Sequence, residues 1–541
     1  MHTIKYFDCN ATYGPYPEKH PRARWTLEQL CEDLSTAGIS GALVHHQQAI
    51  HYDPMEGNMR LLKEINPYRN FLFPCWIALP SIGGDFPDET VFFNTLKDHG
   101  VKAIRIEPSA FNLPVWESVW RKMSKSAEKE NLLTIISRNG FGGDYNEIRN
   151  FLKIFSGVPV LLLDHYWHEW RKVSALMQEC NNLHIEFSSF QANRAVEEFA
   201  GRFGISRCLF GTNLPFKAAG AARGFFDWTL LSRSDAQTAA GDNLARLLGM
   251  KMSALSGLCR IPADNIAAAV NKGEPVPGGA IDGHGHLLHS LGNTGGKCHT
   301  MIKGDAKGVI ELNKKIGITK MMIAPWAGAL SRDDRRGNEI ASDACKEFPD
   351  AFLGIFTVNA EYHTEAEALE ICRRYYELGF AGAKPFHAKG VMYDNPVYHV
   401  IYAFLEAHRM HLWADVSDLT QSTAGREAIT KIARTYPHLP IQLDHCGKSW
   451  EYAETAAEII KSNPNIYAQL NYTLVTNGVI EFLTGEIGAE KLCFGTDAPM
   501  RDPRPQAAWV AYTRINEIDK IKIFNQNLDA ILNRPSPEKI K

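Results

Sequence analysis

Short apolar segments alternate with longer amphipathic ones through the second half of the chain. Strands are predicted at 280–286, 318–326, 351–359, 379–386, 410–416, 440–447, 465–471 and 491–497. Stretches such as 364–379 and 453–463 carry apolar residues at helical spacing between them. Strands that alternate with helices predict a parallel sheet. Eight such units in about 260 residues match the size of a (β/α)8 barrel.

The first half repeats the landmarks of the second in the same order. The matched positions are Asp8 with Asp282, His165 with His445, Asn213 with Asp497 and Asn243 with Asn527. The ordered match predicts a duplication with small insertions. The fold class is therefore α/β, with two tandem (β/α)8 TIM-type barrels at 1–270 and 280–541. The Pro- and Gly-rich segment 271–279 is the expected linker.

Composition excludes several classes of partner. The 541 residues are 45% hydrophobic and 22% charged, with a formal net charge of −3. This balance indicates folded domains and argues against nucleic-acid or polybasic membrane binding. The eleven cysteines show no paired spacing and predict reduced thiols. With no apolar signal segment at the N-terminus and no apolar run long enough to span a membrane, the expected location is the cytoplasm.

The stretch AIDGHGHLLHS at 280–290 holds the first candidate chemistry. On a strand, residues two apart face the same side, so His284 and His286 can bind one metal ion. The alternative is a pair of buried, hydrogen-bonded strand histidines. Asp497, in FGTDAP at the end of the last predicted strand, can add an anionic oxygen. Its alternative is a helix cap. Two nitrogens and an oxygen suit Zn²⁺, which we expect, or Mn²⁺ and related ions.

These motifs resemble those of the amidohydrolase superfamily, specifically its amidohydrolase-related (amidohydrolase 2) branch. The resemblance rests on Asp282-x-His284-x-His286, on Asp444-His445-x-Gly447 and on FGTDAP around Asp497. The branch contains metal-dependent hydrolases, lactonases and nonoxidative decarboxylases. The resemblance implies that Asp497 binds the metal and moves a proton. It also implies that His445 polarises the substrate or handles a proton.

One position departs from the family pattern. Decarboxylase-like relatives carry a metal-binding His at the end of strand 5, where this chain reads HLWADVSD. Asp415 or Asp418 stands near that place, and we take Asp415 as the candidate ligand. A carboxylate can replace an imidazole as a ligand, with a change in metal preference.

Candidate substrate-binding residues lie near the predicted strand ends. Lys384, in GAKPFH, is placed to meet a substrate anion, the metal or carbon dioxide; a surface lysine is its alternative. Arg501 and Arg504 can bind a carboxylate or lie in a solvated loop. The aromatic candidates for the pocket wall, with core packing as their alternative, are Trp326, Tyr393 and Trp413.

The first half lacks the ligand set. Asn10, Thr12 and Asn213 stand where the second half has His284, His286 and Asp497. Amide and hydroxyl groups are poor zinc ligands, and Asn213 cannot act as a base. His165 is the expected survivor of the set. With Arg105 and Arg138 it would give a mouth that accepts anions, so a structural or binding role is expected.

The leading functional hypothesis is metal-dependent hydrolysis of an amide, lactone or related ester of a small anionic substrate. One divalent ion would activate water, with Asp497 as the base. The alternative is nonoxidative decarboxylation of an unsaturated or aromatic carboxylic acid, which the missing strand-5 His disfavours. A noncatalytic two-barrel binding or scaffold protein is the alternative of another class. Relatives commonly pair as homodimers, so we expect the two barrels of one chain to pair, with a homodimer as the further possibility.

Overall fold

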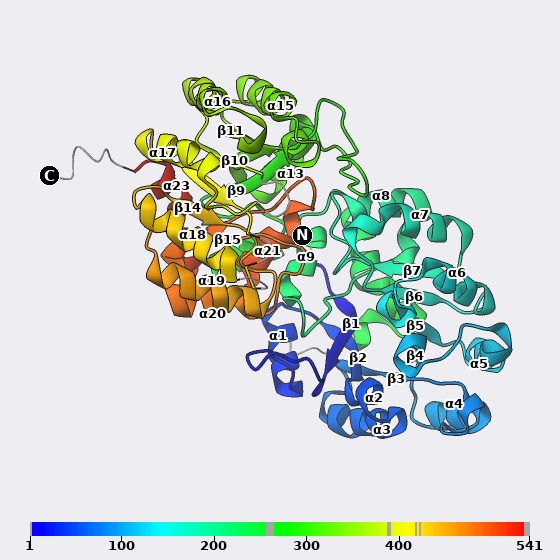
Figure 1. Cartoon of the computed structure of the whole chain (residues 1–541). Helices are drawn as coiled ribbons and strands as arrows, with labels where there is room; N and C mark the ends of the chain where they lie inside the picture. Colours follow the sequence, from blue (N-terminus) through cyan, green and yellow to red (C-terminus); the bar gives the residue numbers. More distant parts are fainter. Residues whose placement is uncertain (1–2, 256–263, 387–390, 417–418, 421–422, 535–541) are drawn as a thin grey trace. The chain divides into compact units, whose positions relative to one another are not determined.

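The chain folds as two (β/α)8 barrels, as predicted (Figure 1). The computed structural model describes residues 3–255, 264–386, 391–416, 419–420 and 423–534. Candidate Asp418 lies outside the described residues. The chain separates into two compact units, Met1–Ala263 and Asp264–Lys541. The predicted start of the linker, residue 271, lies seven residues beyond the start of the second unit.

The first barrel has eight parallel strands in sequential order. They are β1 (Phe7–Tyr13), β2 (Gly41–His46), β3 (Leu72–Ile77), β4 (Ala103–Ile106), β5 (Leu133–Ser137), β6 (Val160–Leu163), β7 (Leu183–Glu186) and β8 (Cys208–Leu209). The main outer helices are α1 (Leu27–Thr36), α3 (Pro54–Ile65), α4 (Glu89–Asp98), α5 (Glu117–Lys129), α6 (Tyr145–Ile154), α7 (Trp170–Glu179), α8 (Ala195–Phe203) and α9 (Ala219–Asp227). Hydrogen bonds from β1 to the segment after β8 close the barrel.

The second barrel repeats this order. Its strands are β9 (Ala280–Leu287), β10 (Ile318–Pro325), β11 (Phe352–Phe356), β12 (Gly382–Ala383), β13 (His411–Ala414), β14 (Ile441–Leu443), β15 (Ile466–Leu470) and β16 (Leu492–Phe494). The main helices are α13 (Ala306–Ile316), α15 (Asp334–Glu347), α16 (Glu365–Glu377), α17 (His399–Ala407), α18 (Thr423–Thr435), α19 (Trp450–Ser462), α20 (Val479–Ile487) and α21 (Pro503–Tyr512). Each observed strand lies within or against the predicted segment, so the strand predictions are confirmed.

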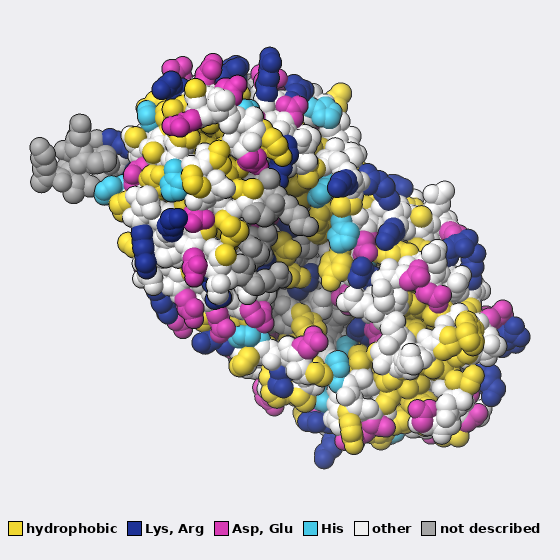
Figure 2. Space-filling view, in the orientation of Figure 1, with side chains coloured by type: hydrophobic (Ala, Val, Ile, Leu, Met, Phe, Trp, Pro, Cys, Tyr) yellow, Lys and Arg dark blue, Asp and Glu magenta, His cyan; other side chains and the backbone are white. Residues whose placement is uncertain are grey.

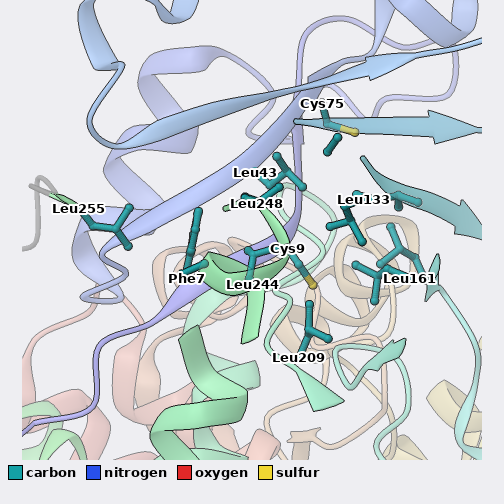
Figure 3. Packing of buried hydrophobic residues seen from close by; sticks show 14 residues of the cluster. Phe7, Cys9, Leu43, Cys75, Leu133, Leu161, Leu209, Leu244, Leu248 and Leu255 are labelled. Carbon is teal, nitrogen blue, oxygen red and sulfur yellow. The ribbon is translucent and has the colours of Figure 1, made fainter. Parts of the chain in front are cut away.

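Apolar side chains fill the interior of each barrel. In the first, Phe7, Cys9 and Leu133 point inward from the strands (Figure 3). Leu244 and Leu248, on and just after α11 (Asn243–Leu247), complete this core. In the second barrel the corresponding cluster includes Ile281, Trp413 and Cys493 with Leu528 and Ile531 of α23 (Asn527–Leu532). The barrels are therefore packed cores and not pores, which leaves their strand ends to carry chemistry.

Repeated hydrogen bonds support the tandem duplication. The Asn243 side chain donates to the carbonyls of Ile205 and Cys208, and the Asn527 side chain donates to those of Ala489 and Leu492. Each asparagine follows a five-residue π-helix, η7 (Thr238–Asp242) or η12 (Lys522–Gln526). These asparagines tie the closing helix to the last strand in both barrels.

The surface mixes the two signs of charge. Lys and Arg side chains lie among Asp and Glu side chains on the visible face of both units (Figure 2). No described helix is long and apolar enough to cross a membrane. Ten cysteines lie in the described residues, and all of them are free thiols.

Candidate metal and substrate site

Two histidines and one aspartate converge at the end of β9. The Nε2 atoms of His284 and His286 lie 3.4 Å and 3.2 Å from Oδ1 of Asp497. One donor atom from each of the three residues lies within 4.8 Å of the others, and all three side chains are buried. Two nitrogens and a carboxylate at this spacing fit a divalent cation. The structure thus brings together the predicted ligands from the two ends of the second barrel.

Asp282 holds the backbone next to two of these ligands, His284 and Asp497. Its Oδ1 accepts hydrogen bonds from the backbone N–H of His284, at 3.0 Å, and of Thr496, at 3.1 Å. The Thr496 hydroxyl donates to its second oxygen at 2.5 Å. Asp8 makes the same contacts with Asn10 and Thr212 in the first barrel. Asp282 therefore joins the first and last strands, and its role is structural in both barrels.

The backbone turn at Asp497 aims its carboxylate at the histidines. Asp497 has a φ of 64°, in the left-handed region that Asp and Asn tolerate better than most residues. Its backbone N–H donates to the His284 carbonyl at 2.7 Å. Strand β16 therefore ends in a turn that returns the chain to β9.

Burial keeps the imidazoles neutral. Burial lowers the pKa of His284 and places the pKa of His286 well below its ordinary value, with His284 adding to the shift at His286. Burial also lowers the pKa of His445 to about 4, against an opposing effect of Asp415. A neutral imidazole has the lone pair that a metal requires, so the site needs no loss of a histidine proton near neutral pH.

Lys384 lies inside the site. Its Nζ is 3.0 Å from Nε2 of His284 and 2.8 Å from Oδ2 of Asp444. Burial would raise the pKa of Asp444, but His284 and Lys384 hold it well below its ordinary range. Asp444 stood in the quoted strand-6 motif without a predicted role, and the structure makes it the counter-ion of Lys384.

His445 and Asp415 form a second part of the site. The distance from Nε2 of His445 to Oδ2 of Asp497 is 3.6 Å, and from its Nδ1 to Oδ1 of Asp415 is also 3.6 Å. Asp415 groups with Asp444 and His445, and not with the His284, His286 and Asp497 set. The side chain predicted to replace the strand-5 ligand therefore lies beside the proposed proton carrier.

The other candidates divide between the site and the core. Arg501 pairs with Asp497 and donates to the Thr473 hydroxyl. Trp326 meets His286 edge to face, and Trp413 stacks on His284 at 4.5 Å between ring centroids. The Tyr393 hydroxyl accepts from the backbone N–H of Asp415 at 2.6 Å. Arg504 is fully buried and pairs with Asp502, which makes it structural.

Gln469 is a site residue that the sequence analysis did not identify. Its Oε1 lies 2.6 Å from Nδ1 of His284, and both side chains are fully buried. The available signal was a lone inward amide in the apolar strand IYAQL.

The first barrel keeps the positions but changes their chemistry. Strand pairing places Arg105 at the position of Lys384 and Glu186 at the position of Gln469. A Leu163 side chain replaces Asp444, and a small cavity of about 10 Å³ beside it is lined by Asn10 and Arg105. A space of this size holds about one water molecule. The cavity beside Asn10 and Arg105 therefore has room for little more than water.

The structure corrects one match between the halves. Leu162 pairs opposite Ile185 as Leu443 pairs opposite Ala468, which aligns Asp164 rather than His165 with His445. Both Asp164 and His445 have left-handed φ values, 58° and 63°. The Asn213 amide contacts Asp164 as Asp497 contacts His445.

His165 does not join Arg105 and Arg138 in the anion-accepting mouth that the sequence predicts for the first barrel. His165 packs against Phe190 in the interior of the first unit, with the rings tilted at 50° and their centroids 4.7 Å apart. It is fully buried, one residue past the position that matches His445. Arg138 is held by Glu169, at 2.9 Å from Nε to Oε1.

The match to a known protein family falls within the second barrel. An amidohydrolase family model matches residues 326–531. Gamma-resorcylate decarboxylases of Rhodococcus jostii (strain RHA1) and Rhizobium sp. (strain MTP-10005) are 25% identical, over 36% of this chain and 74% and 73% of theirs. The solved 2,6-dihydroxybenzoate decarboxylase from Rhizobium has a TM-score of 0.38 at 18% identity, covering 47% of this chain and 98% of that one. A 5-carboxyvanillate decarboxylase from Novosphingobium aromaticivorans, complexed with manganese, has a TM-score of 0.37 at 16% identity, over 47% and 96%.

Proposed function

With the second barrel taken as a barrel of the amidohydrolase family, we propose that it is a metal-dependent nonoxidative decarboxylase of a hydroxylated aromatic carboxylic acid. The observation that carries the proposal is the convergence of His284, His286 and Asp497 with a buried lysine, Lys384, 3.0 Å from His284. Such a site offers ligands for a cation and a positive side chain for a carboxylate. The two curated relatives named above are decarboxylases, which supports this reaction over the hydrolysis favoured by the sequence analysis.

The donor set fits one divalent ion. His284, His286 and Asp497 would hold it through two imidazole nitrogens and one carboxylate oxygen. When bound, such an ion polarises oxygen atoms of the substrate and stabilises negative charge that develops on it. Zinc and manganese both accept this mixed donor set, and zinc stays our prediction from the sequence. Asp415 is proposed to act through His445 and not as a ligand.

Lys384 and Arg501 are the candidates for holding the substrate anion. The Lys384 ammonium pairs with Asp444 at 2.8 Å, and the Arg501 guanidinium pairs with Asp497. The Lys384 ammonium also lies 3.0 Å from Nε2 of His284, so both cations contact a proposed ligand. A guanidinium can hold a carboxylate through two parallel hydrogen bonds, while an ammonium acts as a point charge.

Each turnover needs one proton at the ring. Loss of carbon dioxide breaks the bond between the ring and the carboxyl carbon and leaves the electron pair on the ring carbon. A proton must then bond to that carbon. Asp497 and His445 are the proposed carriers, because Oδ2 of Asp497 lies 3.6 Å from Nε2 of His445. Asp415, 3.6 Å from the other ring nitrogen, would orient this imidazole.

The aromatic wall suits a planar substrate. Trp326 lies edge to face against His286 and borders the polar donors, while Trp413 stacks on His284 from the packed core of the barrel. Aromatic side chains add stacking contacts worth about 0.5–1.5 kcal/mol per pair beyond burial. Exclusion of water by these rings would also strengthen the electrostatic contacts of the site.

The test is a direct assay of carbon dioxide release by the purified full chain loaded with zinc or manganese. With 2,6-dihydroxybenzoate as probe, we expect carbon dioxide and 1,3-dihydroxybenzene in equal amounts. Asp497→Asn should lower turnover by roughly 10²–10⁴-fold, because an amide cannot carry the proton. Asn213→Ala, at the matching place in the first barrel, is the control and should leave turnover unchanged.

Three outcomes separate the alternatives. Hydrolysis of lactones or amides without carbon dioxide release would favour the hydrolase reading. Wild-type rates in Asp497→Asn would remove Asp497 as the proton carrier. Elemental analysis should find about one divalent ion per chain, lost in the His284→Ala/His286→Ala variant. Equal metal in that variant would contradict the ligand assignment.

A further inference from the structure

We propose that Gln469, held by Gln442, is a positioning residue that fixes the tautomer of His284 so that its Nε2 lone pair faces the ligand group. The inference rests on the proposed metal site, because its purpose is to present a nitrogen to the cation. Gln469 lies on β15 and Gln442 on β14, each one residue before the last residue of its strand.

The orientation of the Gln469 amide follows from its own partners. Its Nε2 donates to the Gly283 carbonyl at 2.5 Å and to Oε1 of Gln442 at 2.7 Å. Both acceptors can only receive a hydrogen bond, so the nitrogen must face them and Oε1 must face His284. An amide oxygen only accepts, and the short contact of 2.6 Å therefore requires the proton of His284 on Nδ1.

Lys384 gives an independent argument for the same tautomer. Its Nζ lies 3.0 Å from Nε2 of His284. An ammonium donates and does not accept, so Nε2 must offer a lone pair to it. The Gln469 oxygen accepts at Nδ1 and the Lys384 ammonium donates at Nε2, so both contacts require the Nδ1–H form of His284. Asp444 also approaches Nδ1, but its Oδ1 lies at 3.3 Å, farther than Gln469.

His286 reaches the same orientation by a different route. Its Nδ1 lies 3.0 Å from the Ala324 carbonyl, which leaves Nε2 facing Asp497. A backbone carbonyl thus orients one ligand, and a side-chain amide orients the other. The two histidines of β9 present matching nitrogens because both Nδ1 atoms have acceptors.

The packing around Gln469 is specific. A Cβ on Gly495 would lie 3.0 Å from Cβ of His284 and 3.2 Å from Cγ of Gln469, so glycine makes room for the pair. Gln442 is fully buried, and among the described residues its Nε2 finds no hydrogen-bond partner. A buried amide with an unpaired N–H destabilises the fold. Gln442 still accepts the Gln469 N–H through its Oε1 and so helps to fix the orientation of the Gln469 amide.

The first barrel shows the converse arrangement. Glu186 stands at the Gln469 position and Leu161 at the Gln442 position, and Asn10 replaces His284. Glu186 carries no amide N–H, and its contacts go to Ser188 and Asn10. The half without the ligand histidine therefore also lacks the amide pair.

The direct test is nitrogen-15 NMR of the histidine side chains in the metal-free full chain. The His284 signal, assigned by its loss in His284→Gln, should show a protonated Nδ1 and an unprotonated Nε2. A protonated Nε2, or a doubly protonated ring near neutral pH, would overturn the proposal. This measurement needs neither metal nor turnover, so it stands even if the proposed function fails.

Metal affinity provides the second readout, measured by chelator competition with Zn²⁺ and Mn²⁺. Gln469→Leu removes the acceptor and should weaken binding roughly 10–100-fold, as expected for loss of an outer-shell partner. Gln469→Glu keeps an acceptor for Nδ1 but loses the N–H that Gly283 and Gln442 accept, so it should keep the Nδ1–H signal and recover only part of the affinity. Glu186→Leu is the matched control in the first barrel and should bind metal like the wild type.

Wild-type affinity in a folded Gln469→Leu variant would contradict the positioning role. If that variant fails to fold, the NMR of the wild type and of Gln469→Glu decides the matter. If the wild type binds no metal while His284 shows the Nδ1–H form, the proposed function fails and the tautomer assignment stands.

Discussion

Lys384 places a positive charge where a metal ion would also bind. Its Nζ is 3.0 Å from the nitrogen that His284 would offer to the cation. A unit positive charge and a divalent ion about 4 Å apart repel by roughly 8 kcal/mol at an effective dielectric constant of about 20. The ion pair with Asp444, 2.8 Å away, offsets part of this repulsion. Lys384 is thus expected to lower metal affinity while providing a contact for the substrate anion.

Lys384→Met should therefore tighten metal binding and weaken catalysis. Loss of the ammonium removes a competing cation and leaves the Asp444 carboxylate free to attract the metal. The metal-free variant should be less stable by roughly 3–5 kcal/mol, because a buried carboxylate loses its partner. Chelator competition, thermal unfolding with and without metal, and kcat/KM on 2,6-dihydroxybenzoate would measure the three effects. Unchanged or weaker metal binding would contradict this account.

At the scale of elements, one strand position carries different chemistry in the two barrels. The last residue of β7, Glu186, matches Gln469 near the end of β15. Burial raises the pKa of Glu186 to about 7, although hydrogen bonds from Ser188 oppose the shift. Its protonated form is thus favoured in the folded state. A carboxyl group with a raised pKa stabilises the fold below its unfolded pKa and loses that contribution as the pH rises through 7.

Glu186→Gln should consequently flatten the dependence of first-barrel stability on pH. Relative to wild type, the variant should gain stability between about pH 5 and pH 8, by roughly 3 kcal/mol at most. Calorimetric unfolding across this range would measure the change. The exposed Glu128→Gln is the control and should keep the wild-type profile. A variant whose slope equals that of the wild type would show that Glu186 titrates normally.

At the scale of the whole molecule, a short helix marks where the second unit begins. Helix α12 (Asn265–Asn271) is capped by Asp264, whose carboxylate also pairs with Lys520 at 2.6 Å. Ile266 and Val270 are buried on it. The predicted domain boundaries assigned this helix to the first barrel, whereas its contacts with Lys520 lie within the second unit.

A second barrel expressed from residue 264 should accordingly be more stable than one expressed from residue 278. The shorter chain loses three large buried aliphatic side chains, Ile266, Val270 and Val276, worth roughly 5–9 kcal/mol together. Size-exclusion chromatography and thermal unfolding of the two chains would show the difference. The pairing of barrels expected from the sequence is tested in the same experiment by adding residues 1–263 as a separate chain. Equal stability of the two chains would remove the role assigned to α12.

The sequence by itself determined the barrels, the duplication and the three proposed ligands. Alternation of short apolar and amphipathic segments is a local property, and strand ends in a parallel barrel all meet at one face. His284 and His286 are two residues apart on one strand, and Asp497 follows the last strand. Their proximity therefore follows from strand order alone.

Only the tertiary structure decided the partners of those ligands. Gln469 is 185 residues from His284. The left-handed turn at His445 ends the regular alternation of β14, so no spacing rule predicts that Asp415 meets His445. Both halves contain an Asp-His pair, Asp164-His165 and Asp444-His445. Strand pairing nevertheless aligns Asp164 with His445, so His165 lies one residue past the matching position. Hydrogen-bonded strand pairing sets which side chains face the barrel mouth, and local sequence identity does not specify that register.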